Sequence, residues 1–205
     1  MKRIYFTAVP LPSNFILNTQ HITCDNIRLR TDDALFFPIS RLMEATMRPG
    51  DEAILIAIRQ TNDSGDANMK RLRQDLETFR FPCPIKEITV PENQKGDTLI
   101  EMFKQMAVAV PPKCCLYADS TFGTKTYPIL LFTALHYAEK IKECEVKHLI
   151  YQEQHRDAQT HQVKDTSLYD VTSLFYLNGV VDALCQSEAD VEEKDSMLAS
   201  MLAGI

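Results

Sequence analysis

Short apolar runs alternate with amphipathic segments along most of this chain, and this alternation constrains the fold more than any other feature. A short apolar run bounded by turn residues is typical of a buried strand, whereas apolar residues three and four positions apart are typical of a helix. Alternation of the two predicts parallel strands joined by right-handed helical crossovers. The predicted strands lie at 4–9, 53–58, 85–90, 113–118 and 146–152, and the predicted helices between them at 34–47, 66–80, 97–110 and 126–143.

The C-terminal part of the chain departs from this pattern. A weaker strand over 161–166 follows the fifth apolar run closely enough to form a hairpin with it, and an apolar helix over 171–185 comes next. The predicted fold is therefore α/β and Rossmann-like, with a doubly wound, mostly parallel six-stranded sheet. Helices cover both faces, and a strand hairpin plus a helix ends the domain. We expect this domain over 1–186 and a helical linker or tail over 187–205.

The charge balance limits the partners of the protein. The chain has 22 Lys and Arg residues against 28 Asp and Glu residues, a formal net charge of −6. This argues against bulk binding to nucleic acid, which depends on clustered basic side chains, but not against a small phosphorylated ligand. No run approaches the roughly 18 apolar residues of a membrane span. The apolar stretch after Met1 is broken at Pro10, so it indicates a strand rather than a signal peptide.

Six cysteines, at 24, 83, 114, 115, 144 and 185, lack the C-x-x-C spacing of metal or redox motifs. The five histidines do not supply ligand pairs either. The cysteines are therefore typical of reduced thiols in the core of a cytoplasmic protein. We therefore expect no metal and no cofactor.

The segment from Asp119 to Lys125 carries the most informative chemistry, because it joins a buried strand to a helix through three hydroxyl residues, one glycine and one lysine. Backbone N–H groups at a helix N-terminus attract phosphate, and Lys125 adds a positive charge. A helix cap with a tight turn explains the same residues, so both interpretations stay open. A P-loop is excluded, because Ala118 stands where its first glycine is required and Lys125 does not follow a glycine.

The pattern Asp119-x-Thr121-x-x-x-Lys125 resembles the [DN]-x-[ST]-x-x-x-[KR] signature of the CRISPR-associated Rossmann fold (CARF) domain. The order of elements over 1–186 is also similar to that family. The resemblance implies a homodimer that binds cyclic oligoadenylate, the second messenger of type III CRISPR antiviral defence, across its interface. Ligand binding would regulate an attached or partner effector. One lysine per subunit slightly favours cyclic tetra-adenylate over cyclic hexa-adenylate.

The resemblance also implies a ligand-binding set. The loop that ends at Lys125 would cradle the phosphates, the exit of the first strand would line the pocket, and Thr61 and Asn62 would contact adenine or ribose. Phe122 either stacks on a base or packs in the core. The predicted residues are Thr7, Ala8, Val9, Pro10, Leu11, Ser13, Asn14, Thr61, Asn62, Asp119, Ser120, Thr121, Phe122, Gly123, Thr124 and Lys125.

Catalysis is not assigned by the sequence. The sequence offers no carboxylate pair or metal cluster that indicates a nuclease, deaminase or protease. A slow, metal-independent ring nuclease would use a ribose 2′-OH as nucleophile, helped by Ser13, Lys125 or Lys164. Glu153 and His155 either face the ligand or lie in a solvated turn. Two alternatives to a sensor domain therefore stay open: a stand-alone ring nuclease and an unrelated nucleotide-binding Rossmann-like protein.

Overall fold

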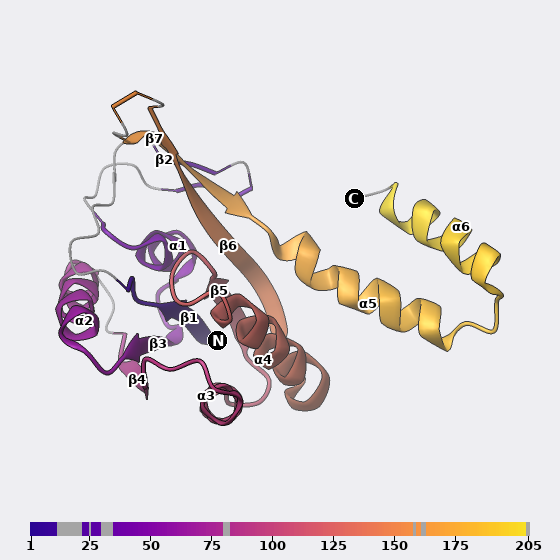
Figure 1. Ribbon diagram of the computed structural model, residues 1–205, viewed down its shortest axis with the longest axis horizontal. Coiled ribbons are helices and arrows are strands. Elements are labelled where there is room, and N and C mark those ends of the chain that lie inside the picture. Colours follow the sequence, from indigo (N-terminus) through magenta and orange to yellow (C-terminus); the bar gives the residue numbers. More distant parts are fainter. Residues whose placement is uncertain are drawn as a thin grey trace. The chain divides into compact units, whose positions relative to one another are not determined.

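The protein divides into two compact units, Met1–Asp170 and Val171–Ile205 (Figure 1). The computed structural model describes residues 1–11, 22–24, 26–29, 35–79, 83–157, 159–160 and 163–203. The first unit contains the sheet and the second contains two helices. The predicted domain boundary after residue 186 lies between those two helices and stays a prediction.

The first unit is built on a sheet with the strand order β2-β7-β6-β5-β1-β3-β4. Every neighbouring pair is parallel except the antiparallel hairpin of β6 and β7. When β2 is left out and the other six strands are numbered one to six along the chain, their order across the sheet is 3-2-1-4-5-6. This order confirms the predicted fold class. The strands are β1 (Lys2–Ala8), β2 (Ile22–Thr23), β3 (Glu52–Gln60), β4 (Ile85–Val90), β5 (Cys115–Asp119), β6 (Glu145–Arg156) and β7 (Val163–Asp170).

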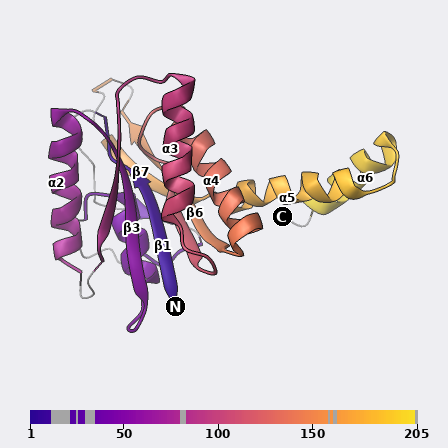
Figure 2. The same ribbon diagram turned by 90° about the horizontal axis from the view of Figure 1, so that it is seen from below.

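Helices cover both faces of this sheet. Those of the first unit are α1 (Pro38–Thr46), α2 (Asp63–Glu77), α3 (Gly96–Ala109) and α4 (Tyr127–Lys142). Helix α1 contacts α2, and α3 contacts α4. Figure 2 shows α2 on one side of β1 and β3, with α3 and α4 on the other. The central strands are apolar without interruption because they are buried on both faces.

The core on the α1 side centres on two aromatic rings. Tyr5 and Tyr117 stack with their ring centroids 4.7 Å apart, on the neighbouring strands β1 and β5. The hydroxyl groups of Tyr5 and Thr46 are 2.9 Å apart, which ties β1 to α1. Ile39 and Leu42 of α1 are fully buried in the same cluster. This packing fixes the register of the central strands. It therefore also fixes the positions of the ends of those strands.

Two helices begin differently from the prediction. Helix α2 begins at Asp63, not at residue 66, and its cap is Asn62, whose side chain accepts a 2.7 Å hydrogen bond from the Gly65 N–H. The sequence predicts the first helix from residue 34, with Asp32 or Asp33 as its cap, and residues 31–34 lie outside the described part of the chain. Helix α1 begins at Pro38 instead, and the carboxylate of Asp75 in α2 accepts hydrogen bonds from the N–H groups before it.

The hairpin is longer than predicted. Strand β6 continues to Arg156 rather than ending at residue 152, and β7 continues to Asp170 rather than ending at residue 166; residues 161 and 162 of the predicted strand lie outside the described part of the chain. The extra residues are all paired across the hairpin, as in the register of Glu153 with Ser167. The carboxyl end of β6 therefore extends past the end of β5, beside the loop that follows β5.

The second unit consists of α5 (Thr172–Gln186) and α6 (Val191–Leu202). A capping box between Asp190 and Glu193 begins α6, as the acidic start of the predicted tail helix allows. None of the helices in the described part of the chain combines the length and apolar character that a membrane-spanning helix needs.

Candidate functional site

The carboxyl ends of β1 and β5 lie side by side at the centre of the sheet. The next helix after β1 is α1, which packs beside α2 on one face, and the next helix after β5 is α4, which packs beside α3 on the other. Such a switch point opens a crevice between the two exit loops, and ligands of open α/β sheets bind there. The candidate site therefore lies at the carboxyl ends of β1 and β5.

A buried carboxylate joins the two strand ends. Asp119 is fully buried and accepts hydrogen bonds from the Thr7 hydroxyl at 3.0 Å and from the Thr121 N–H at 2.9 Å. Burial raises the pKa of Asp119 to about 6, although these donors and the N–H of Ile39 act in the opposite direction. The structure thus places Thr7 and Asp119 inside the protein, where they position the loops.

Most hydroxyl groups of the β5–α4 loop have protein partners. The Ser120 hydroxyl donates to the carbonyl oxygen of Ile150 at 3.0 Å, and the Thr121 hydroxyl accepts a 2.9 Å hydrogen bond from the N–H of Gln152. Both partners belong to β6. The hydroxyl groups of Thr124 and Thr126 lie 2.8 Å apart. These bonds fix the loop against β6, while the side chain of Lys125 is exposed.

Gly123 permits close contact between this loop and the end of β1. Its φ of +105° is a conformation that other residues rarely adopt. A Cβ at this position would lie 3.0 Å from the Cβ of Ala8. Within the described residues, the N–H groups of Gly123, Thr124 and Lys125 have no hydrogen-bond acceptor. These three donors precede α4, where the helix dipole favours an anion.

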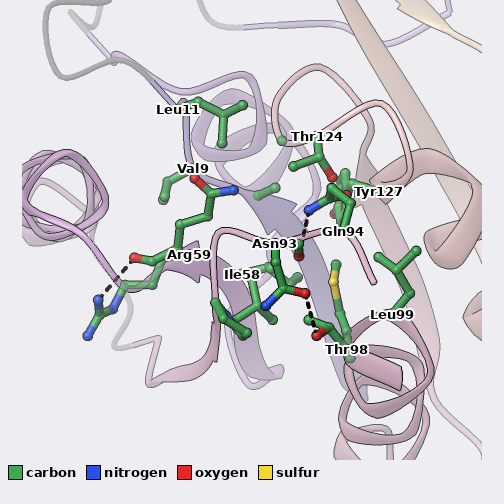
Figure 3. A pocket seen from close by; sticks show the side chains of 16 residues that line it. Val9, Leu11, Ile58, Arg59, Asn93, Gln94, Thr98, Leu99, Thr124 and Tyr127 are labelled. Atoms are coloured by element: carbon green, nitrogen blue, oxygen red, sulfur yellow. Dashed lines mark hydrogen bonds between the residues drawn. The ribbon is translucent and has the colours of Figure 1, made fainter. Parts of the chain in front are cut away.

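A shallow cleft lies next to this loop (Figure 3); it encloses only about 20 Å³, and about 380 Å³ when the open space at its mouth is included. It brings together five predicted residues: Ala8, Val9, Leu11, Gly123 and Thr124. It also contains residues that the sequence prediction missed, from the ends of β3 and β4, from α3 and from the start of α4. Those residues are Ile58, Arg59, Gln60, Val90, Pro91, Asn93, Gln94, Thr98, Leu99, Met102 and Tyr127.

The lining of the cleft is apolar or neutral and polar. Gln60, Asn93 and Gln94 contribute amide groups. Arg59 is its charged member, but its guanidinium group points away from the cleft (Figure 3). It forms ion pairs with Asp66 at 2.7 Å and Glu87 at 3.0 Å. The cleft therefore suits an uncharged group with hydrogen-bonding edges better than a phosphate.

The loop after β4 closes one side of this cleft. Gln94 accepts a hydrogen bond from the Thr126 hydroxyl through its Oε1 and donates from Nε2 to the carbonyl oxygen of Asn93 at 3.2 Å. The Oδ1 of Asn93 accepts a 2.8 Å hydrogen bond from the Thr98 hydroxyl. These contacts join the β4–α3 loop to the start of α4. The polar run from Pro91 to Gly96 after an apolar strand is the sequence signal that could have identified this loop.

The other predicted residues lie elsewhere or in structural roles. The Thr61 hydroxyl donates to the carbonyl oxygen of Val90 at 3.1 Å, and Asn62 caps α2. Pro10 is buried, and its carbonyl oxygen accepts a 2.8 Å hydrogen bond from the side chain of Asn68. Phe122 is buried and packs edge-on against Phe37, which favours the packing alternative. Ser13, Asn14 and the side chain of Lys164 lie outside the described residues.

His155 lies on the outer part of the hairpin. Its Nε2 is 3.2 Å from the Ser167 hydroxyl and 3.9 Å from a Glu153 carboxylate oxygen. Both partners approach the same ring nitrogen, so the three residues do not form a relay from acid to histidine to nucleophile. Across the described ranges, no group of three or more His, Cys, Asp or Glu residues is arranged to hold a metal ion.

In comparisons with known proteins, no family model and no curated protein matches the sequence. The fold is Rossmann-like. That statement rests on the 3-2-1-4-5-6 strand order and on helices that cover both faces. A Rossmann-like sheet supports many unrelated functions, so the function has to be argued from the residues of the site.

Proposed function

We propose that the first unit binds cyclic oligoadenylate as a homodimer and passes this signal to an attached or partner effector. The observation that carries the proposal is the meeting of the β1 exit and the β5–α4 loop at the switch point. There the Asp119-x-Thr121-x-x-x-Lys125 pattern, which resembles the CARF signature, follows the strand beside β1. This is the position in the sheet at which that family carries its signature.

The loop offers what a phosphate needs. The N–H groups of Gly123, Thr124 and Lys125 lack acceptors within the described residues, and the Lys125 ammonium group is exposed beside them. A cyclic ligand with two-fold symmetry suits a dimer in which each copy presents the same loop. Because contacts of this kind are local, the net charge of −6 does not oppose binding.

The neighbouring cleft offers what a base needs. At the mouth of the cleft, apolar side chains can cover one face of a purine, and amide groups such as those of Gln60 and Asn93 can bond to its edge. The phosphates of the ligand would thus bind the loop and its bases would bind the cleft, two adjacent surfaces of different polarity.

Isothermal titration calorimetry tests this proposal, with cyclic tetra-adenylate, cyclic hexa-adenylate and linear tetra-adenylate as ligands. We expect one ring per two chains, and a loss of about tenfold or more in affinity for Lys125→Ala, as removal of a charged phosphate contact implies. Lys113→Ala is the matched control, because Lys113 is equally an exposed lysine but lies before β5, at the opposite end of that strand. Absence of ring binding, or equal affinities for both variants, would refute the proposal.

A second candidate is a protein that binds a single nucleotide. The observation in its favour is that residues of one chain line the whole cleft. The same titration with adenosine monophosphate separates the two functions, since this alternative predicts one nucleotide per chain and no preference for the ring. Incubation of the ring with the protein, followed by chromatography, reports any ring-nuclease activity.

A further inference from the structure

Two buried thiols meet at the amino end of the sheet, opposite the candidate site. Cys114 directly precedes β5 and Cys144 directly precedes β6. Their Sγ atoms lie 3.4 Å apart, and the exposed fractions of the two residues are 4% and 6%. Thirty positions of sequence separate them, so the sheet rather than the local chain brings them together.

Backbone hydrogen bonds hold the pair on both sides. The N–H of Lys113 donates to the carbonyl oxygen of Lys142 at 2.9 Å, and the N–H of Glu145 donates to the carbonyl oxygen of Cys114 at 3.0 Å. The next residues, Cys115 and Glu145, are partners in the parallel ladder. Neighbouring strands are about 4.8 Å apart, which is within the Cα separation that a disulfide requires. The two sulfur atoms can therefore bond after small side-chain rotations.

The thiols also share one acceptor. The carbonyl oxygen of Pro111 lies 3.3 Å from the Sγ of Cys114 and 3.4 Å from the Sγ of Cys144. Cys115, although adjacent in sequence, has its Sγ 3.4 Å from the Sδ of Met1 instead. Successive residues of a strand point to opposite faces, so Cys115 cannot take part in the pair.

We propose that Cys114 and Cys144 form an oxidation site that closes as an intramolecular disulfide and clamps the segment between them. That segment contains β5, the β5–α4 loop and α4. In the reaction both S–H bonds break and one S–S bond forms. Two electrons and two protons pass to the oxidant, such as an azodicarboxamide, whose N=N bond is reduced to a hydrazine. This inference does not depend on the ligand of the candidate site.

The surroundings of the pair predict how the reaction depends on pH. Burial raises the pKa of Cys114, and the neighbouring Cys144 thiol raises it further. The thiolate is the species that attacks, so oxidation is slow at neutral pH and becomes faster as the pH rises. The closed loop restricts the unfolded chain, and the oxidised protein is therefore the more stable form.

The test treats the reduced, full-length protein with azodicarboxamide at pH 7 and pH 9, then maps peptides without reduction. We expect a crosslink between Cys114 and Cys144, faster formation at pH 9, and a rise in Tm of roughly 5–10 °C that dithiothreitol reverses. Cys114→Ser and Cys144→Ser should abolish the rise, whereas Cys115→Ser should keep it. Because these variants alter a packed core, circular dichroism confirms that each one folds.

The peptide map of the wild-type protein decides the matter even if a variant is unstable. Free thiols at both positions after treatment at pH 9 would refute the oxidation site. A crosslink of Cys114 to another cysteine would refute the assignment of the pair. A correct crosslink without any rise in Tm would refute the clamp.

Discussion

The hydroxyl group of Thr7 donates a 3.0 Å hydrogen bond to the carboxylate of Asp119, across 112 positions of sequence. Both residues are fully buried, and each stands at the carboxyl end of its strand. The bond therefore fixes the distance between the two loops that form the switch point.

Replacement of Thr7 by Val keeps the shape of the side chain and removes the donor to Asp119. The buried carboxylate then loses a partner, at a cost of about 1–3 kcal/mol in the free energy of unfolding. Urea unfolding followed by circular dichroism measures this change. Thr7→Ser retains the hydroxyl group and should lose less; an equal loss for both variants would mean that packing, not the hydrogen bond, matters.

Because of Asp119, the free energy of unfolding should fall as the pH rises. Burial raises its pKa to about 6 in the folded protein, above the roughly 3.9 of an unfolded chain, so the folded state holds the proton more tightly. The favourable contribution is complete below about pH 4 and is lost as the pH rises through 6. Between these limits the wild type should lose on the order of 2 kcal/mol relative to Asp119→Asn.

Unfolding free energies at several pH values check this difference. Asp75, whose pKa burial also raises, is present in both proteins, so its contribution cancels in the comparison. Parallel pH curves for the wild type and Asp119→Asn would contradict the prediction.

Replacement of Gly123 by Ala should strain the contact between the β5–α4 loop and β1. The added Cβ would meet the Cβ of Ala8 at 3.0 Å and the Tyr127 ring at 3.1 Å, at a φ of +105°. We expect a loss of about 1–3 kcal/mol in thermal or urea unfolding. Gly96→Ala is the control, because a Cβ at Gly96 has no atom within 4 Å. Similar losses for both variants would argue against the close approach.

Replacement of Asn62 by Ala should weaken α2 by about 1 kcal/mol, because the N-cap acceptor for Gly65 disappears. Asn62→Ser keeps a capping oxygen and should recover most of the loss in urea unfolding. If Asn62→Ala left stability unchanged but weakened binding of a nucleotide, the ligand contact implied by the family resemblance would replace the capping role.

The succession of strands and helices along the chain could be predicted because each element carries its own local signal. Buried strands such as β1 are continuous apolar runs, and helices such as α3 show helical spacing. The ends of elements were less predictable, since distant contacts decide them. Helix α1 begins just after Phe36 and Phe37, whose N–H groups donate to the carboxylate of Asp75 in α2, and no residue near Pro38 in the sequence indicates this contact. Four consecutive residues that can cap a helix, from Thr61 to Ser64, and Asp66 shortly after them offered several caps for α2, and the structure uses Asn62.

The candidate site was predictable in part for a similar reason. The loops after β1 and β5 follow central strands, so the switch-point rule pointed to them. Asn93 and Gln94 follow β4, an edge strand, and that rule gave no reason to choose them. They reach the cleft because α3 carries the chain from β4 back toward β5, past β3 and β1. Only the path of this crossover reveals their contribution.

The cleft collects its lining from the ends of three strands, the loops beside them and two helices, and this distribution affects how a ligand can be found. Residues from Ala8 to Tyr127 must all reach their native places before the cleft exists, so no single hairpin or helix pair forms it alone. A bound molecule consequently stabilises the sheet unit as a whole, by mass action on its unfolding equilibrium. A thermal-shift screen of nucleotides can thus reveal the ligand while its binding mode is still unknown.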